Sequence, residues 1–166
     1  MGRAVRRVPK GWEHPRDDRG RYHPLHDEDF AAVAQEWKRL FAAWEARDPT
    51  AWAADAPTAE EFAHHEFWEW HGDPPDRDSY RPTWSPDEQT HYQMYETVSE
   101  GTPVSPVLDS PEALARWLAD TGADAGAGTA TYAQWLRVCR GGYAPTFVLH
   151  DGRIESGVAA LGEAEG

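Results

Sequence analysis

The chain has 166 residues, which is enough for one domain of ordinary size with a real hydrophobic core. It carries 16 basic and 29 acidic residues, for a net charge of −13, and its single cysteine is Cys139. A lone cysteine excludes an internal disulfide and a thiolate zinc site, and no apolar run approaches the roughly 18–20 residues that span a bilayer. No apolar stretch follows the basic N-terminal residues, so a secretory signal is not expected and the cytoplasm is the expected compartment.

The charge is unevenly distributed along the chain. Residues 1–21 hold seven bases and three acids, a net +4, whereas the remaining 145 residues hold nine bases and 26 acids, a net −17. Such a surface repels nucleic-acid phosphates and attracts basic proteins within a Debye length of ~8–10 Å. The acidic body is therefore not expected to bind nucleic acid directly. Two interpretations stay open: the body occupies the nucleic-acid site of a basic protein, or its acidity only provides solubility.

The N-terminal segment contains three prolines, many charges and no hydrophobic period, and we interpret residues 1–26 as an extended basic arm. The arm is expected to be ordered only where an apolar side chain docks on the body. A helical region is expected over residues 27–72. Its first helix is predicted over residues 27–47, because apolar side chains recur there at helical spacing and Asp27 or Asp29 can cap its start.

A second helix is predicted from Thr58 to Trp70. Thr58 and Glu61 form the capping-box pattern, and the Gly-Asp-Pro-Pro sequence after His71 ends the helix. A connector rich in proline and aspartate follows over residues 73–91. It is the best candidate for a boundary within the chain.

The last part of the chain, residues 92–160, is predicted to be a small α+β region. Ser110 and Thr131 can cap helices, and the Asp-Gly dipeptide at 151–152 indicates a two-residue hairpin. The predicted elements are a strand over 92–98, helices over 110–121 and 131–140, and strands over 146–150 and 153–158. We expect these strands to share one sheet, with both helices on one of its faces. The predicted class is α+β, with a helical N-terminal half and a small antiparallel or mixed sheet covered by helices in the C-terminal half.

A distinctive motif stands in the second half of the chain. Residues 92–107 read YQMYETVSEGTPVSPV, and ALARWL at 113–118 and YAQWL at 132–136 follow; the chain opens with MGRAVRRVP. Over residues 1–12 and 92–147 the chain resembles a family of phage and prophage proteins that share the pattern YxMxETxSEGTPxSPV. Members of that family are often larger and carry cysteine clusters between these two parts. This chain has no such clusters, so any metal role of that insert does not carry over.

The resemblance transfers no activity, but it implies a class of function. Small acidic phage proteins without catalytic motifs are often inhibitors of host machinery, anti-CRISPR proteins among them. The implied partner is a basic host protein in the host cytoplasm, such as a CRISPR effector or another nucleic-acid-handling complex. Nucleic-acid mimicry is one mechanism for such inhibition. The alternative is a structural or accessory phage protein that acts through oligomer contacts.

The densest group of titratable residues lies in the predicted helix 58–70 and the turn after it. On a continuous helix, acids at 60 and 69 are about 13 Å apart along the axis, comparable with two phosphate steps of a nucleic-acid strand. Trp68 follows the polar stripe and has the character of an interface hot spot, unless it packs under the N-terminal arm. The predicted partner-binding residues are Glu60, Glu61, Glu66, Trp68, Glu69, Asp73 and Asp76.

No residue pattern indicates catalysis or a cofactor, and we expect neither an enzyme nor a metal site. His64 and His65 offer too few organised ligands for tight metal binding and are interpreted as part of a solvated face. Cys139 lies on the apolar side of a predicted helix and is interpreted as a buried structural thiol. The proline-rich loop over residues 99–107 is interpreted as a rigid crossover, and it is the second place to look for a binding site.

Overall fold

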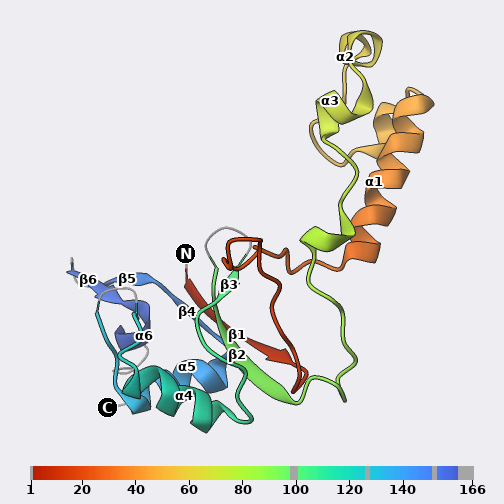
Figure 1. The fold of residues 1–166 in the computed structure, drawn as a ribbon. Coiled ribbons are helices and arrows are strands. Elements are labelled where there is room, and N and C mark those ends of the chain that lie inside the picture. The colour runs from red at the N-terminus through yellow and green to blue at the C-terminus, as the bar shows by residue number, and fades with distance from the viewer. Residues whose placement is uncertain (1, 98–100, 126–127, 151–152, 161–166) are drawn as a thin grey trace. The chain divides into compact units, whose positions relative to one another are not determined.

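The computed structural model describes residues 2–97, 101–125, 128–150 and 153–160 (Figure 1). The chain divides into two units, the first made of residues 1–25 and 83–166 and the second of residues 26–82. The first unit combines strands and helices, whereas the second is helical. Each unit has a hydrophobic core of its own.

An antiparallel sheet forms the centre of the first unit. Within the described residues its strands follow the order β3-β2-β1-β4. They are β1 (Gly2–Val8), β2 (His91–Glu96), β3 (Thr102–Pro103) and β4 (Tyr143–Pro145). The longest pairing joins β1 to β2, with Arg3 opposite Glu96 and Val8 opposite His91. The sheet therefore depends on residues that are far apart in the sequence.

Two helices, α4 (Pro111–Asp120) and α5 (Tyr132–Gly141), lie side by side and pack against the sheet (Figure 1). The hydroxyls of Ser110 and Thr131 accept hydrogen bonds from the first turn of each helix, so both predicted caps are confirmed. Met94 of β2 is fully buried in the core that these helices cover. The helical residues of that core are Leu114, Ala115, Leu118, Trp135, Val138 and Cys139.

The C-terminal strands form a separate hairpin. β5 (Phe147–His150) pairs antiparallel with β6 (Arg153–Ser156), and the short helix α6 (Gly157–Ala160) follows. The predicted pairing of these two strands is confirmed, while the turn predicted at 151–152 lies outside the described residues. The prediction that they share one sheet with the strand at 92–98 is wrong. β2 takes β1 and β3 as its neighbours instead.

The second unit consists of short helices around an aromatic core. α1 (Phe30–Glu45) begins after Asp29, whose carboxylate accepts a hydrogen bond from the N–H of Ala32, as one of the two predicted caps. α2 (Ala59–His64) and α3 (Phe67–His71) follow, and single 3-10 turns stand at Pro49–Ala51 and Arg77–Ser79. The buried residues of this core are Leu40, Trp44 and Phe67, with Trp37, Phe41, Trp52, Phe62 and Trp70 packed around them.

The predicted fold class needs correction. The molecule does combine helices and strands, but its N-terminal half is not helical, because the chain starts with β1 and the helices α1 to α3 lie mid-chain. Of the predicted arm over residues 1–26, residues 2–8 are a strand inside the sheet. Arg3 is buried beside Glu96 and Asp124, at 3.8 and 3.7 Å, and the guanidinium of Arg6 lies 4.0 Å from the Tyr95 ring centroid. These partners allow a strand rich in arginine to be buried.

The longest helix of the described residues is α1, with 16 residues. Among the described residues, no helix combines the length and the apolar composition that crossing a membrane requires.

Candidate functional site

The predicted acidic face lies on the second unit, but its backbone is not the predicted one. The helix predicted from Thr58 to Trp70 is broken at His65, whose φ of −121° and ψ of 149° are extended. A second helix starts after Glu66, because the Glu69 carboxylate accepts a hydrogen bond from the N–H of Glu66 at 3.0 Å. The spacing of about 13 Å that a continuous helix gives to the outer acids is therefore wrong.

Three of the predicted partner-binding carboxylates hold local backbone in place. Glu61 accepts a hydrogen bond from the N–H of Thr58 at 2.7 Å, and this bond and the one from the Thr58 hydroxyl lower the pKa of Glu61 below its usual range. Glu69 caps α3 as described, and Asp76 accepts from the N–H of Asp78 at 3.1 Å. These bonds fix the positions of the carboxylates.

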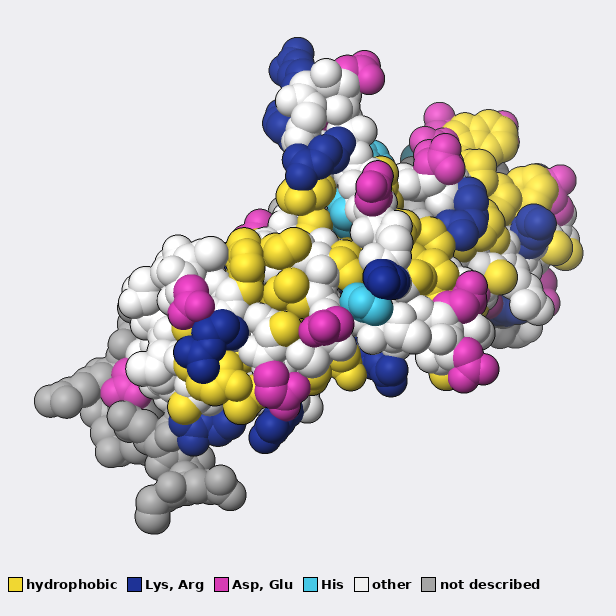
Figure 2. All heavy atoms as spheres, turned by 60° about the horizontal axis from the view of Figure 1, so that its bottom comes forward, with side chains coloured by type: hydrophobic (Ala, Val, Ile, Leu, Met, Phe, Trp, Pro, Cys, Tyr) yellow, Lys and Arg dark blue, Asp and Glu magenta, His cyan; other side chains and the backbone are white. Residues whose placement is uncertain are grey.

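The remaining predicted residues are exposed. Glu60, Glu66 and Asp73 are open to solvent, and Trp68 exposes 49% of its surface, whereas its neighbour Phe67 is buried in the core of the unit. The stretch over residues 60–76 therefore carries exposed acids before and after one accessible indole in the sequence. Figure 2 shows acidic and basic side chains interspersed with hydrophobic side chains at the surface.

Apolar residues of the predicted arm pack within the first unit. Val8 is fully buried in the sheet, and the indole N–H of Trp12 donates a hydrogen bond to the Tyr95 hydroxyl at 3.0 Å. Trp12 also packs edge-on against Trp84, with ring centroids 4.8 Å apart. The docking that the sequence required for an ordered arm is thus present.

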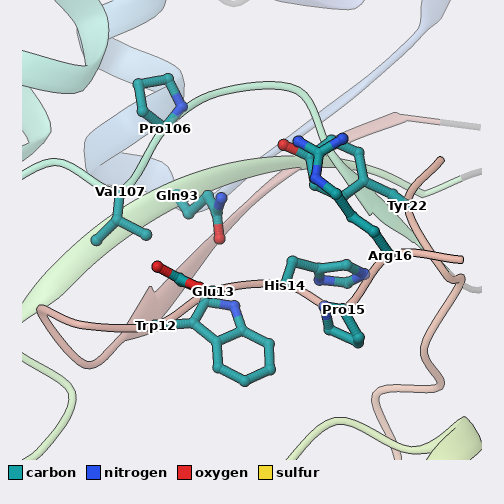
Figure 3. A pocket seen from close by; sticks show the side chains of 9 residues that line it. All are labelled: Trp12, Glu13, His14, Pro15, Arg16, Tyr22, Gln93, Pro106 and Val107. Atoms are coloured by element: carbon teal, nitrogen blue, oxygen red, sulfur yellow. The ribbon is translucent and has the colours of Figure 1, made fainter. Parts of the chain in front are cut away.

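A pocket of about 540 Å³ opens on the first unit beside these contacts (Figure 3). Its volume lies within the range of about 300–1,000 Å³ that is usual for ligand sites. One wall is the segment after β1, and another is Pro106 and Val107, from the end of the motif at 92–107. The lining residues are Trp12, Glu13, His14, Pro15, Arg16, Tyr22, Gln93, Pro106 and Val107.

The floor of this pocket is a buried polar network around Tyr95. The Tyr95 hydroxyl donates a hydrogen bond to the Gln93 carbonyl oxygen at 2.8 Å, and the Gln93 amide donates to the carbonyl of Ser105 at 2.9 Å. His14 bridges the network to the neighbouring segment. Its Nε2 lies 2.7 Å from the carbonyl of His23 and its Nδ1 lies 3.3 Å from the Tyr95 hydroxyl.

The hydrogen count of this network fixes the role of His14. A carbonyl only accepts, so Nε2 of His14 carries a proton that it donates to His23. The single hydroxyl proton of Tyr95 is directed to Gln93. In neutral His14 the Nδ1 atom is an acceptor, so the Tyr95 hydroxyl, 3.3 Å away, does not donate a proton to it. Burial nevertheless lowers the pKa of His14 below its ordinary value of 6.5. The positive charges of Arg6 and Arg16 act in the same direction, while the hydrogen bond to the carbonyl of His23 acts against them. The imidazole is therefore neutral at pH 7.

The loop over residues 99–107, the second candidate site from the sequence, makes hydrogen bonds that hold it in place. The Ser105 hydroxyl accepts a hydrogen bond from the N–H of Met94 at 2.9 Å and donates to the carbonyl of Pro106. Gly101 has a φ of +84°, and a Cβ atom there would collide with the guanidinium of Arg6. This loop is thus held against β2, as the rigid crossover interpretation expects, while its residues 98–100 lie outside the described part.

The titratable groups give no metal centre in the described residues. There, no group of three or more His, Cys, Asp or Glu side chains is placed to hold an ion. Cys139 of α5 is buried in the core of the first unit, and burial raises the pKa of its thiol to about 12, with Glu112 adding to the shift. The sequence interpretation of Cys139 as a structural thiol agrees with this position.

Sequence reasoning missed the pocket and most of its lining. Gln93 and Tyr95 share one face of the strand predicted over residues 92–98, and large polar side chains repeated on that face were the available signal. Trp12 and His14, the partners of Tyr95, lie in a segment without hydrophobic periodicity. No local sequence pattern therefore predicted that this segment packs against the strand. Comparison of the chain with protein-family models, curated proteins and solved structures gives no match.

Proposed function

We propose that the protein is a phage-type regulator that binds and inhibits a basic, nucleic-acid-handling host protein. It does so through the acidic stretch of its second unit, residues 60–76. The observation that supports this most is the separation of charge between the units. Residues 26–82 hold 14 acids and five bases, a net −9 in 57 residues, whereas the other 109 residues carry a net −4. A short segment with that charge is drawn to basic surfaces.

The accessible Trp68 supplies the second requirement of such an interface. Surface charges mainly set the association rate and the salt dependence, and a desolvated indole mainly slows dissociation. Glu69, next to Trp68 in the chain, is held by its backbone bond, and Glu60 and Glu66 are exposed to solvent. A protein that normally holds nucleic acid, of which a CRISPR effector is one example, offers the complementary basic surface.

Affinity capture from a bacterial host lysate tests the proposal. The bait is the full chain, and the matched variant is Glu60→Lys/Asp73→Lys, which leaves the capping carboxylates Glu61 and Glu69 in place. We expect nucleic-acid-handling proteins to be retained by the wild-type chain, lost on the variant and displaced by added duplex DNA. Retention of the same proteins by both baits would contradict the proposal.

A structural role through oligomer contacts is the second candidate. Large apolar side chains are exposed on the strands β4 and β5, where Tyr143 exposes 51%, Phe147 47% and Leu149 72% of its surface. Such residues suit contacts between copies of a chain. Salt separates the two functions, because the affinity of a charge-driven complex falls with ionic strength whereas that of an apolar contact does not.

A further inference from the structure

The pocket of the first unit is bordered by extended main chain with an open edge. Arg16 pairs with Tyr22 in one antiparallel bridge, in which the N–H of Asp17 donates to the carbonyl of Arg21 and the N–H of His23 donates to that of Pro15. In a bridge of this kind the N–H and C=O of the paired residue point away from the partner segment.

Two positions on the outer side of this bridge lack a main-chain partner among the described residues; Arg16 is exposed, and His14 is buried in the lining of the pocket. Neither His14 nor Arg16 forms a main-chain hydrogen bond to another residue of the described chain. In extended chain these two positions, two residues apart, point their N–H and C=O groups to the same side. Such an edge is the template on which an extended peptide adds a strand.

The side chains beside this edge have mixed chemistry. Trp12, Tyr22 and Val107 are half-buried and offer apolar surface, while Glu13 is exposed. The guanidinium of Arg16 is already engaged, 3.7 Å above the Tyr22 ring and donating to the carbonyl of Gly20 at 2.7 Å. In Figure 3 Arg16 and Tyr22 lie together at one end of the pocket, and Trp12, Glu13 and Val107 lie toward the other.

We propose that this pocket binds an extended peptide segment that pairs with the main chain of residues 14–16, places an apolar side chain between Trp12 and Val107, and directs a basic side chain to Glu13. The network of Trp12, His14, Gln93 and Tyr95 holds the floor in one arrangement before binding, which lowers the entropic cost of association. The site is independent of the acidic stretch in the second unit.

Charge favours a peptide over a nucleic-acid strand as the occupant. Trp12 and Tyr22 could stack on bases, but the exposed carboxylate of Glu13 repels phosphates, and the guanidinium of Arg16 is committed to Tyr22 and Gly20. A basic side chain of a peptide is attracted by the carboxylate of Glu13. Open main-chain donors and acceptors also match an extended peptide, which directs the N–H and C=O of every second residue to the same side.

A random octapeptide library displayed on beads tests the site with the full chain. Selected peptides are expected to carry a basic residue beside an apolar one and to bind Glu13→Lys and Val107→Arg variants about tenfold more weakly. The charge-matched Glu60→Lys variant in the second unit is expected to bind them like the wild-type chain. If the wild-type chain and Glu60→Lys/Asp73→Lys retained the same lysate proteins while these peptide results held, only the proposed function would be overturned.

Methylation of peptide nitrogens tests the main-chain pairing itself. N-methylation at alternate residues that face positions 14–16 is expected to weaken binding about tenfold, and methylation of the residues between them to have little effect. An equal effect at all positions would overturn the proposal, as would selection of no peptide that distinguishes the wild-type chain from Val107→Arg. Tighter binding of an eight-nucleotide oligothymidylate than of any selected peptide would also overturn it, in favour of a nucleic-acid strand.

Discussion

Tyr95 joins three segments of the first unit through one buried hydroxyl. Trp12 donates to it, Gln93 accepts from it and His14 lies 3.3 Å away, while the Arg6 guanidinium covers its ring. A buried polar group that loses its partner costs about 1–3 kcal/mol. The network is therefore a stabilising feature as well as the floor of the pocket.

Replacement of Tyr95 by Phe is expected to lower the free energy of unfolding by about 1–3 kcal/mol, because the indole N–H of Trp12 and the Gln93 oxygen lose their partner in the core. Urea denaturation measures the change. Tyr92→Phe is the control, since Tyr92 is half-buried and the same loss is not expected there. Equal stability of Tyr95→Phe and the wild-type chain would show that the hydroxyl network contributes nothing.

The pH dependence of stability should carry the signature of His14. Its pKa in the folded state is lowered, first by burial, so the unfolded state binds the proton more strongly. The stability that follows from the neutral imidazole is fully present above pH 6.5 and is lost as the pH falls through the folded pKa. We expect the difference in unfolding free energy between the wild-type chain and His14→Gln to shrink as the pH falls from 7 to 5. A difference that grows over that range would give the opposite sign and contradict the assignment.

Elements with local signals could be predicted from the sequence. Ser110, Thr131 and the Thr58–Glu61 pair all cap helices where the pattern predicted them, because a cap depends only on residues within one turn. The hairpin β5–β6 was predicted for the same reason. The break at His65 was not, since a second Glu-based cap eight residues after the first has a weak signature and apolar residues continued at helical spacing through it.

Thr131→Ala is expected to cost about 0.5–2 kcal/mol of stability, because the hydroxyl accepts from the N–H of Gln134 at the start of a helix that packs in the core. Thermal or urea unfolding measures the loss. Thr129→Ala is the matched control, as Thr129 is exposed and caps no helix of the described chain, and its effect should stay within about 0.5 kcal/mol. Equal losses in the two variants would rule out the cap as the cause.

The pairing of β1 with β2 could not be predicted from local patterns. Three arginines in seven residues hide the period of a buried strand, and they are accommodated only by partners from distant segments, such as Glu96 and Tyr95. The pocket depends on the same pairing of β1 with β2, so it could not be predicted from local patterns either. Of the predicted acidic face, the residue types and their exposure follow from the sequence, but their spacing does not, because it depends on the break between α2 and α3.

At the scale of the whole molecule, charge and fold divide the chain in the same way. Residues 1–12 and 92–147, on which the expected phage relationship rests, belong to the first unit, whereas the second unit holds the larger share of the negative charge. We interpret the second unit as the part that attracts a basic partner. Raised salt should therefore weaken partner binding mainly through this unit.

Binding kinetics on the captured partner test this interpretation most directly. Surface plasmon resonance compares the wild-type chain with Glu60→Lys/Asp73→Lys and with Trp68→Ala, over a series of salt concentrations. The control for charge is Asp18→Lys/Asp120→Lys, and the control for an exposed aromatic ring is Phe147→Ala, both in the first unit. We expect slower association and a weaker salt dependence for Glu60→Lys/Asp73→Lys, and a dissociation rate about tenfold higher for Trp68→Ala. Neither control should change these rates. Unchanged kinetics in both second-unit variants would show that the acidic stretch is not the interface.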